Sequence, residues 1–382
     1  SSLGKISPIA NEKLIQQLHN GALIANYTGH GGERGWTSER IFLLKDISDM
    51  KNRNKLPLFM TATCEFSRFD NPENVSAGER LLLQPEGGAI ALFTTVRLVF
   101  SIPNFRLNET FYKVLDASIK DGKITIGDLF RKTKVENNGG VNDRNFTLLG
   151  DPAIKLAVPL YKVQLDSLVN SENNDSIKAL SSPEIFGHIE NLFGSTVNEF
   201  NGWIDITLFD KEKEITTLGD DQTAGPFTYA SQEDILFKGK AFVENGRFKS
   251  QIYIPKDTRQ NYGFARFSFY AVDSILGDAS GNNESIVIGG TAENASIDRN
   301  GPEINIYLDD SLFAFGDKVS SSPIFIADLF DSSGINIIPN DVGKDITLII
   351  DERSDLNFLL NQYYQPSKST YQKGEIIFPL EE

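Results

Sequence analysis

Two residues with reactive side chains stand at matching places in this sequence. Cys64, the single cysteine of the chain, follows the apolar stretch 56–63, and His30 follows the apolar stretch 22–28 and is flanked by glycines. A thiolate is a strong nucleophile, and because a free cysteine titrates near about 8.5, a neighbouring imidazole can raise its thiolate fraction. The glycines beside His30 let a carbonyl group approach backbone N–H donors. The two stretches therefore predict nucleophilic thiol chemistry on a carbonyl compound.

The distance between the two stretches fits one edge of a parallel sheet. Parallel strands need a crossover of about a dozen or more residues, usually helical. The segment 37–50 begins with Thr37 as a plausible N-cap and carries enough apolar residues to pack on a sheet. Side chains that follow neighbouring parallel strands share one sheet edge. We therefore expect His30 and Cys64 to face a common crevice.

Plainer interpretations stay open for both residues. A single cysteine is more often a small buried apolar residue than a nucleophile. A histidine beside glycines is usually a loop residue. A redox function for Cys64 is disfavoured, because the chain has no second cysteine that could resolve an oxidised thiol.

The first part of the chain, residues 1–158, has the alternation typical of an α/β domain with a parallel sheet. Predicted strands lie at 22–28, 57–63 and 88–95, and predicted helices lie at 8–19, 37–50, 74–84, 104–118 and 127–134.

From about residue 159 the pattern changes to short alternating strands between Asn, Gly, Asp and Pro turns. This pattern predicts two all-β modules with an immunoglobulin-like sandwich fold, one over 159–290 and a second, incomplete one over 300–382. Strands of the second module are predicted at 304–308 and 346–350. The segment 289–301 is predicted to be a linker between them.

Composition limits the partners. The formal net charge of −15 over 382 residues argues against nucleic-acid binding, which needs a basic face. No apolar run is long enough for a membrane span, no signal peptide begins the chain, and no phosphate loop occurs. No cofactor is expected, although the oxygen-rich clusters 278–283 and 331–336 suit calcium as well as ordinary turns.

The blocks around His30 and Cys64 resemble the gingipain family of cysteine peptidases, and within it the type IX secretion sortases. The similarity spans essentially the whole chain. It is carried by the stretches 26–33, 57–70, 78–79, 87–92, 145–152, 200–202, 239–248, 331–336 and 343–346, together with Trp36.

This resemblance implies a caspase-like fold and a catalytic dyad of Cys64 and His30, with oxyanion donors at Gly31 and the Cys64 amide. Strands upstream of the histidine strand complete the sheet in this family, so we expect here the C-terminal half of a peptidase domain. Residues that flank the dyad are candidates for shaping the substrate cleft, and each fits a solvated loop rim equally well: Glu33, Trp36, Glu65, Phe66, Arg68, Asp70 and Arg97.

The same resemblance implies protein substrates that carry C-terminal sorting domains, and other surface components of the secretion system as partners. It implies a secreted, cell-surface location associated with the outer membrane. Cargo would be hydrolysed or transferred to a surface amine. The alternative class is a non-catalytic surface interaction or scaffold module, in which the peptidase half is vestigial and the acidic β regions dock a secretion partner.

Overall fold

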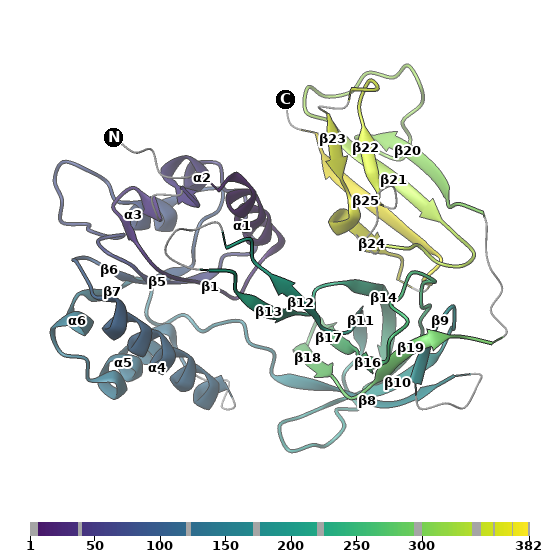
Figure 1. Cartoon of the computed structure of the whole chain (residues 1–382), viewed down its shortest axis with the longest axis horizontal. Helices are drawn as coiled ribbons and strands as arrows, with labels where there is room; N and C mark the ends of the chain where they lie inside the picture. The colour runs from purple at the N-terminus through teal and green to yellow at the C-terminus, as the bar shows by residue number, and fades with distance from the viewer. Residues whose placement is uncertain are drawn as a thin grey trace. The chain divides into compact units, whose positions relative to one another are not determined.

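The computed structural model describes residues 7–36, 40–119, 124–170, 176–219, 225–293, 300–337, 345–353, 356–368 and 370–380. The chain divides into two compact units, residues 1–158 and residues 159–382 (Figure 1). We call them the amino-terminal and carboxy-terminal units and describe each by itself.

The amino-terminal unit is built on a four-stranded sheet in the order β1-β5-β6-β7. Strands β1 (Ile24–Thr28), β5 (Leu58–Ala62) and β6 (Ala91–Thr95) are parallel, which confirms the predicted pairing. The edge strand β7 (Phe146–Gly150) runs antiparallel to β6 and was not predicted. Every residue of β5 is buried, as expected for a strand covered on both faces.

Helices cover both faces of this sheet. One apolar core joins Leu18 of α1 (Pro8–Asn20) and Leu81 of α3 (Ala77–Leu83) to one face. The other core joins α4 (Ser101–Ile119) and α5 (Ile126–Asn137) to the opposite face, with a short α6 (Val141–Arg144) before β7. Four predicted helices are confirmed, with shifted ends.

The predicted crossover helix over 37–50 is wrong in its described part. Residues 37–39, including the expected N-cap, lie outside the described residues. The chain instead forms a small sheet of β2 (Gly31–Gly32), β3 (Gly35–Trp36) and β4 (Phe42–Leu43), followed by the short helix α2 (Leu44–Ser48). The Asp46 carboxylate accepts the Leu43 N–H at 2.7 Å, so the helix starts late.

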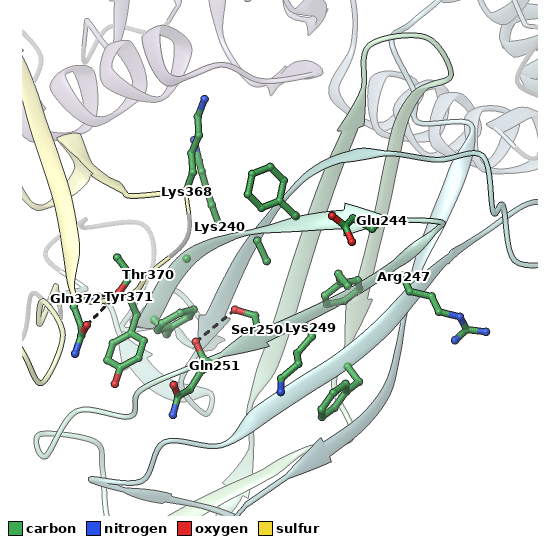
Figure 2. Close-up of a pocket in the computed structure, with 16 residues that line it drawn as sticks. Lys240, Glu244, Arg247, Lys249, Ser250, Gln251, Lys368, Thr370, Tyr371 and Gln372 are labelled. Atoms are coloured by element: carbon green, nitrogen blue, oxygen red, sulfur yellow. Dashed lines mark hydrogen bonds between the residues drawn. The ribbon is translucent and has the colours of Figure 1, made fainter.

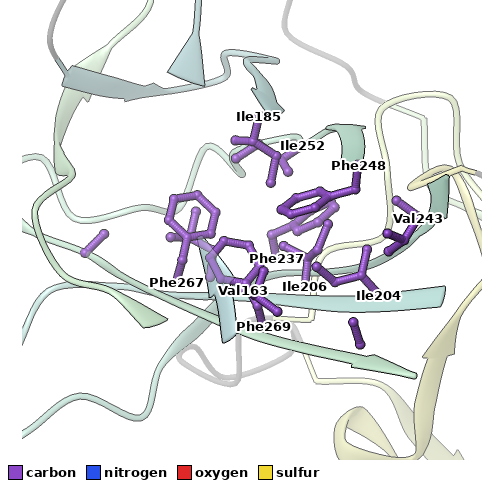
Figure 3. Packing of buried hydrophobic residues seen from close by; sticks show 14 of the residues in the cluster. Val163, Ile185, Ile204, Ile206, Phe237, Val243, Phe248, Ile252, Phe267 and Phe269 are labelled. Carbon is purple, nitrogen blue, oxygen red and sulfur yellow. The ribbon is translucent and has the colours of Figure 1, made fainter. Parts of the chain in front are cut away.

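The carboxy-terminal unit contains a closed barrel in the order β10-β15-β14-β11-β17-β18-β8. Its strands are β8 (Tyr161–Val169), β10 (Glu184–Glu190), β11 (Gly202–Phe209), β14 (Ile235–Glu244), β15 (Arg247–Gln251), β17 (Arg266–Asp273) and β18 (Gly277–Asn283). Alternate side chains point inward, as Ile204, Ile206 and Phe267 do in the barrel core (Figure 3).

The structure does not confirm an immunoglobulin-like sandwich in this region. Strands β18 and β8 pair in parallel at Ala279–Tyr161 and Ser280–Lys162, which joins the two ends of the main sheet. A smaller sheet of β16 (Gly263–Phe264), β19 (Val287–Thr291) and β9 (Ser176–Ala179) and a hairpin of β12 (Lys213–Thr216) and β13 (Thr228–Ser231) accompany the barrel.

The end of the unit forms a four-stranded sheet in the order β20-β21-β25-β24, from β20 (Glu303–Leu308), β21 (Ile324–Phe330), β25 (Lys373–Pro379) and β24 (Tyr364–Pro366). A second pair is β22 (Thr347–Ile349) and β23 (Asn357–Leu359), with a short 3₁₀ helix η1 (Asn361–Tyr363) before β24. The predicted strands at 304–308 and 346–350 correspond to β20 and β22. The expected linker is partly strand, because β19 reaches Thr291, and its residues 294–299 lie outside the described part.

The two oxygen-rich clusters differ in structure. Residues 278–283 belong to β18, where Asp278 accepts a hydrogen bond from the Tyr270 hydroxyl at 2.6 Å. Asp331 forms a local turn with the Ser333 N–H at 2.7 Å. Among the described residues, no group of three or more potential metal-binding side chains occurs, and no helix is long and apolar enough to cross a membrane.

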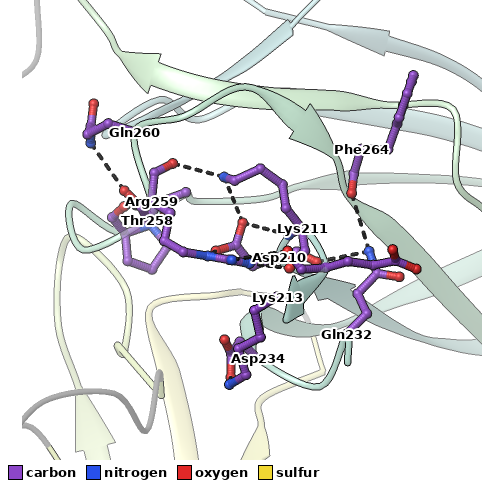
Figure 4. Close-up of polar contacts among 11 residues, drawn as sticks. Asp210, Lys211, Lys213, Gln232, Asp234, Thr258, Arg259, Gln260 and Phe264 are labelled. Carbon is purple, nitrogen blue, oxygen red and sulfur yellow. Dashed lines mark hydrogen bonds and ion pairs between the residues drawn. The ribbon is translucent and has the colours of Figure 1, made fainter. Parts of the chain in front are cut away.

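A buried ionic cluster holds the loop after β11 (Figure 4). Asp210 accepts hydrogen bonds from Lys211 Nζ at 2.9 Å and Arg259 Nε at 2.8 Å, and the side chains of Asp210 and Lys211 are only 4% exposed. Burial alone raises the pKa of Asp210, but the hydrogen bonds from Lys211 and Arg259 outweigh it and hold this pKa below its ordinary value. The charged carboxylate therefore stabilises the fold.

Replacing Asp210 by asparagine is expected to destabilise the carboxy-terminal unit by about 3–5 kcal/mol, because Lys211 becomes a buried charge without its partner. In the native protein this stabilisation is complete above the ordinary pKa of 3.8 and is lost as the pH falls through the depressed pKa. Urea unfolding can be followed by Trp203 fluorescence in a Trp36→Phe background, because the chain has two tryptophans, one per unit.

The matched control is Asp205→Asn, which breaks a 3.6 Å ion pair with Lys240 in which the Asp205 side chain is 49% exposed. Less than about 1 kcal/mol is expected there. An Asp210→Asn protein with native stability, or with unchanged acid sensitivity, would show that the cluster does not stabilise the fold.

Candidate active site

The register of the sheet brings His30 and Cys64 to one edge. Thr28 of β1 is paired with Ala62 of β5, and His30 and Cys64 each lie two residues beyond this pair, past the carboxyl ends of their strands. In parallel strands, paired residues share one face of the sheet. An imidazole after β1 and a thiol after β5 therefore lie at the same edge of the sheet.

The turn after Cys64 is held by backbone contacts to its neighbours. Glu65 adopts a left-handed conformation with φ 51°, which is uncommon for a residue other than glycine. Its N–H donates to Arg97 O at 3.3 Å, Ser67 N–H donates to Thr95 O at 2.9 Å, and Gly78 N–H donates to Phe66 O at 2.9 Å. These bonds fix the direction in which the chain leaves the nucleophile position.

The thiol itself is half-buried and lies under the loop that follows β6. Cys64 Sγ donates a hydrogen bond to Val99 O at 3.6 Å. Two asparagines tie this region to β5, because Asn142 bonds the Phe100 N–H at 2.9 Å and Asn104 at 3.1 Å, and Asn104 bonds Ala62 O at 3.2 Å. The surroundings of the thiol are thus set by residues from the sheet and from α4 and α6.

His30 is exposed and sits in the glycine-rich turn before β2. The Tyr27 hydroxyl donates to His30 O at 2.7 Å and so fixes the backbone of this residue. Gly31 lies against the side chain of Thr63, because a Cβ atom on Gly31 would stand 2.6 Å from Thr63 Oγ1. The turn that carries the imidazole is therefore packed directly on the residue before Cys64.

Two of the predicted cleft residues belong to the core instead. Trp36 is 2% exposed and Phe66 0% exposed, and both lie in an aromatic cluster with Tyr27, Phe42 and Phe59. Trp36 stacks on Tyr27 with ring centroids 4.3 Å apart. The prediction that Trp36 and Phe66 form an open rim is corrected, because their burial leaves no surface for a substrate in this structure.

The charged candidates form two ion-pair groups near the nucleophile. Arg68 Nη1 lies 3.3 Å from Glu33 Oε1 and 3.3 Å from Glu65 Oε1, so the structure brings these three residues together. Arg97 makes a bidentate pair with Asp70, at 3.0 and 2.5 Å, and this guanidinium holds the pKa of the Asp70 carboxyl below its ordinary value. These side chains retain exposed surface at the edge of the sheet.

Several buried hydroxyl groups near the nucleophile turn were not predicted from the sequence. Thr61, Thr94 and Ser67 form a buried chain, in which Thr61 Oγ1 lies 2.8 Å and Ser67 Oγ 2.9 Å from Thr94 Oγ1. The Thr95 hydroxyl donates to the carbonyl of Thr63. Hydroxyl residues near the carboxyl ends of otherwise apolar strands were the available signal.

A groove of about 710 Å³ on the carboxy-terminal unit is lined by several lysine and arginine side chains (Figure 2). Most of these cations pair with carboxylates. Lys249 pairs with Glu184 at 2.7 Å, Lys240 with Asp205 at 3.6 Å, and Arg247 with Asp166 at 3.9 Å. Nearby carboxylates thus pair with three of the four cations, and the fourth, Lys368, lies over the Trp203 ring. We assign this groove no function.

Comparison with known proteins gives a consistent result for the amino-terminal unit. Residues 1–157 match the profile of peptidase family C25. Gingipain R1 of Porphyromonas gingivalis is 24% identical over 264 residues, which cover 61% of this chain and 26% of that protein. This chain therefore spans about a quarter of the length of that relative.

Solved structures of similar proteins include dimeric latent PorU from Porphyromonas gingivalis, with 29% identity, coverage of 77% of this chain and 28% of that chain, and a TM-score of 0.38. The Arg-specific cysteine proteinase gingipain R has 17% identity, coverage of 73% and 56%, and a TM-score of 0.35.

The sheet edge that carries a thiol and an imidazole at matched positions lies within the part of the chain that is similar to this family of cysteine peptidases. The profile match over residues 1–157 confirms the resemblance to this family that the sequence predicted.

Proposed function

We propose that the chain carries the nucleophile and the acid–base group of a cysteine endopeptidase, with Cys64 and His30 as its dyad. The observation that carries this proposal is the β1–β5 register, which sets both residues two positions beyond the Thr28–Ala62 pair. A dyad needs this proximity, because the imidazole must reach both the thiol and the departing amine.

The proposed reaction proceeds through a thioester. The Cys64 thiol passes its proton to His30, and the sulfur bonds to the peptide carbonyl carbon while the C=O electron pair moves to oxygen, where the Gly31 and Cys64 amides stabilise it. Collapse of this intermediate breaks the C–N bond, and the imidazolium of His30 gives its proton to the leaving amine. Water or an amine then attacks the thioester carbonyl, and the neutral imidazole accepts the proton of that second nucleophile. The C–S bond breaks, and the Cys64 thiolate that leaves regains its proton from the imidazolium.

The proposed substrates are secreted proteins with C-terminal sorting domains, and the proposed location is the cell surface at the outer membrane. Both follow from the resemblance to type IX secretion sortases. A bound amine can compete with water because positioning supplies effective molarities of about 10⁵ M or more. Glu33, Glu65, Arg68, Asp70 and Arg97 remain candidates for the rim of the cleft, since they lie at this edge with exposed surface.

Mass spectrometry of a cargo protein incubated with the complete enzyme tests the proposal. The expected result with purified lipopolysaccharide acceptor or a simple amine is cleaved cargo joined to the amine, with less hydrolysed product. Hydrolysed cargo alone at saturating acceptor would leave a plain endopeptidase. Intact cargo in every condition, with the sorting domain still attached, would contradict the peptidase proposal.

One observation favours the second candidate, a non-catalytic surface module. The hydrogen bond of the Cys64 thiol goes to Val99 O, and none joins it to His30 among the described residues. In that case the acidic β regions dock a secretion partner, and no cargo is cleaved. The Cys64→Ala protein would then bind this partner as well as the native protein does.

A further inference from the structure

The carbonyl of Thr63, the residue before Cys64, is held from one side of β5. The Thr95 hydroxyl at the end of β6 donates a hydrogen bond to this carbonyl, and both residues are fully buried. No cis peptide bond occurs in the described chain. The C=O and N–H of a trans peptide point in opposite directions. Holding the carbonyl toward β6 therefore turns the Cys64 N–H away from β6.

Two backbone bonds define the sides of β5 around this peptide. Gly29 N–H donates to Ala62 O at 3.4 Å, so the Ala62 carbonyl faces β1. Glu65 N–H donates to Arg97 O at 3.3 Å, so the Glu65 amide faces the chain that continues from β6. Because the Thr63 carbonyl is held by Thr95 of β6, the trans Thr63–Cys64 peptide points the Cys64 N–H to the opposite side, the side of β1.

The second proposed oxyanion donor lies on the same side. Gly31 follows β1 and packs on the Thr63 side chain, at the close approach already described. Cys64 lies beyond the end of β5. Among the described residues, its N–H makes no hydrogen bond to a backbone carbonyl of the turns and loops. An unpaired N–H that faces the glycine turn of His30 has the placement that an oxyanion donor requires.

We propose that Thr95 is a positioning residue for the oxyanion site. Its hydroxyl holds the Thr63–Cys64 peptide so that the Cys64 N–H points at the developing oxyanion. Thr95 acts through this peptide and does not touch the substrate. Without the hydroxyl, the buried Thr63 carbonyl loses its hydrogen-bond donor. The Thr63–Cys64 peptide can then rotate and turn the Cys64 N–H away from the oxyanion. This inference rests on the proposed peptidase function.

Two thiol probes separate the orientation of the amide from the reactivity of the sulfur. A peptide aldehyde forms a hemithioacetal: the sulfur bonds to the carbonyl carbon, the C=O pair moves to oxygen, and the thiol proton ends on that oxygen. This adduct uses the oxyanion donors. Iodoacetamide forms an S–C bond and releases iodide and a proton, and no oxyanion develops.

The test compares Thr95→Val and Thr95→Ser in the 382-residue chain. A panel of tripeptide aldehydes, varied at the residue that carries the aldehyde, identifies the tightest probe for the native protein. Losing one oxyanion donor costs about 10²–10³-fold, so Thr95→Val is expected to weaken this probe at least about tenfold. Alkylation of Cys64 by iodoacetamide should stay within about twofold, because the position of the sulfur is unchanged. Thr95→Ser, which keeps the hydroxyl, should restore aldehyde binding.

Thr61→Val is the matched control, because it removes a buried hydroxyl of the same sheet that bonds Thr94 and not the Thr63 carbonyl. Its ratio of aldehyde affinity to alkylation rate should equal the native ratio. An unchanged ratio in Thr95→Val, or equal losses with both probes, would overturn the positioning role. A native protein that binds no aldehyde of the panel would instead count against the peptidase function itself.

Discussion

Replacement of Cys64 by alanine is expected to lower the rate of cargo cleavage at least about a thousandfold, because no other thiol exists to form the thioester. Replacement of His30 by alanine is expected to cost about 10²–10⁴-fold, the usual contribution of a positioned acid–base group. His30→Ala should also slow the labelling of Cys64 by iodoacetamide near neutral pH. Cleavage is measured by mass spectrometry and labelling by the loss of free thiol.

His19→Ala is the control for the dyad variants. His19 ends α1 in the same unit and interacts with Lys51 and Lys55, away from the sheet edge that carries Cys64. We expect native cleavage and labelling in this variant. If iodoacetamide labels Cys64 equally fast in the native and His30→Ala proteins, the imidazole does not activate the thiol, and cleavage by the Cys64→Ala protein at the native rate would exclude Cys64 as the nucleophile.

The second large effect is expected from Gly31→Ala, with the neighbouring Gly32→Ala as its control. An added Cβ on Gly31 would lie 2.6 Å from Thr63 Oγ1 and 3.0 Å from Gly35 O, whereas no atom lies within 4 Å of a Cβ on Gly32. The methyl group must push the glycine turn off Thr63, and the Gly31 amide and His30 move with it. The loss of a positioned oxyanion donor costs about 10²–10³-fold in catalysis.

We therefore expect Gly31→Ala to lose at least about a hundredfold in cleavage rate, and Gly32→Ala to stay within about threefold of the native rate. Circular dichroism and Trp36 fluorescence in a Trp203→Phe background would report whether the fold persists, because Trp36 belongs to the core of this unit. Similar losses in both glycine variants would mean that general flexibility of the turn, and not the contact with Thr63, limits the reaction. Native activity in Gly31→Ala would remove Gly31 from the proposed oxyanion site.

The pairing of β1 with β5 was readable from the sequence because it depends on local pattern and spacing. The apolar stretches before His30 and Cys64, separated by a crossover length, predicted two neighbouring parallel strands, and β1 and β5 pair in this way. Strand periodicity likewise indicated the all-β character of the second unit. Each of these signals lies within one short stretch of sequence, so none required knowledge of contacts between distant residues.

Other features depend on contacts between distant parts of the chain, and only the tertiary structure decided them. Phe66 and Trp36 look like rim residues beside Cys64 and His30. Trp36 instead packs on both Phe59 and Phe66, and this aromatic cluster buries the two residues. The barrel closes through a two-residue pairing between β18 and β8, which lie far apart in the sequence.

The hydrogen bond between the Thr95 hydroxyl and the Thr63 carbonyl joins the ends of two neighbouring strands. Neither stretch of sequence by itself predicts this bond. The sequence by itself determined which residues can perform thiol chemistry and on which strand ends they stand. The tertiary structure determined which neighbours are buried and which groups hold the Cys64 peptide in place, because burial and hydrogen bonding across a sheet depend on how the strands pack.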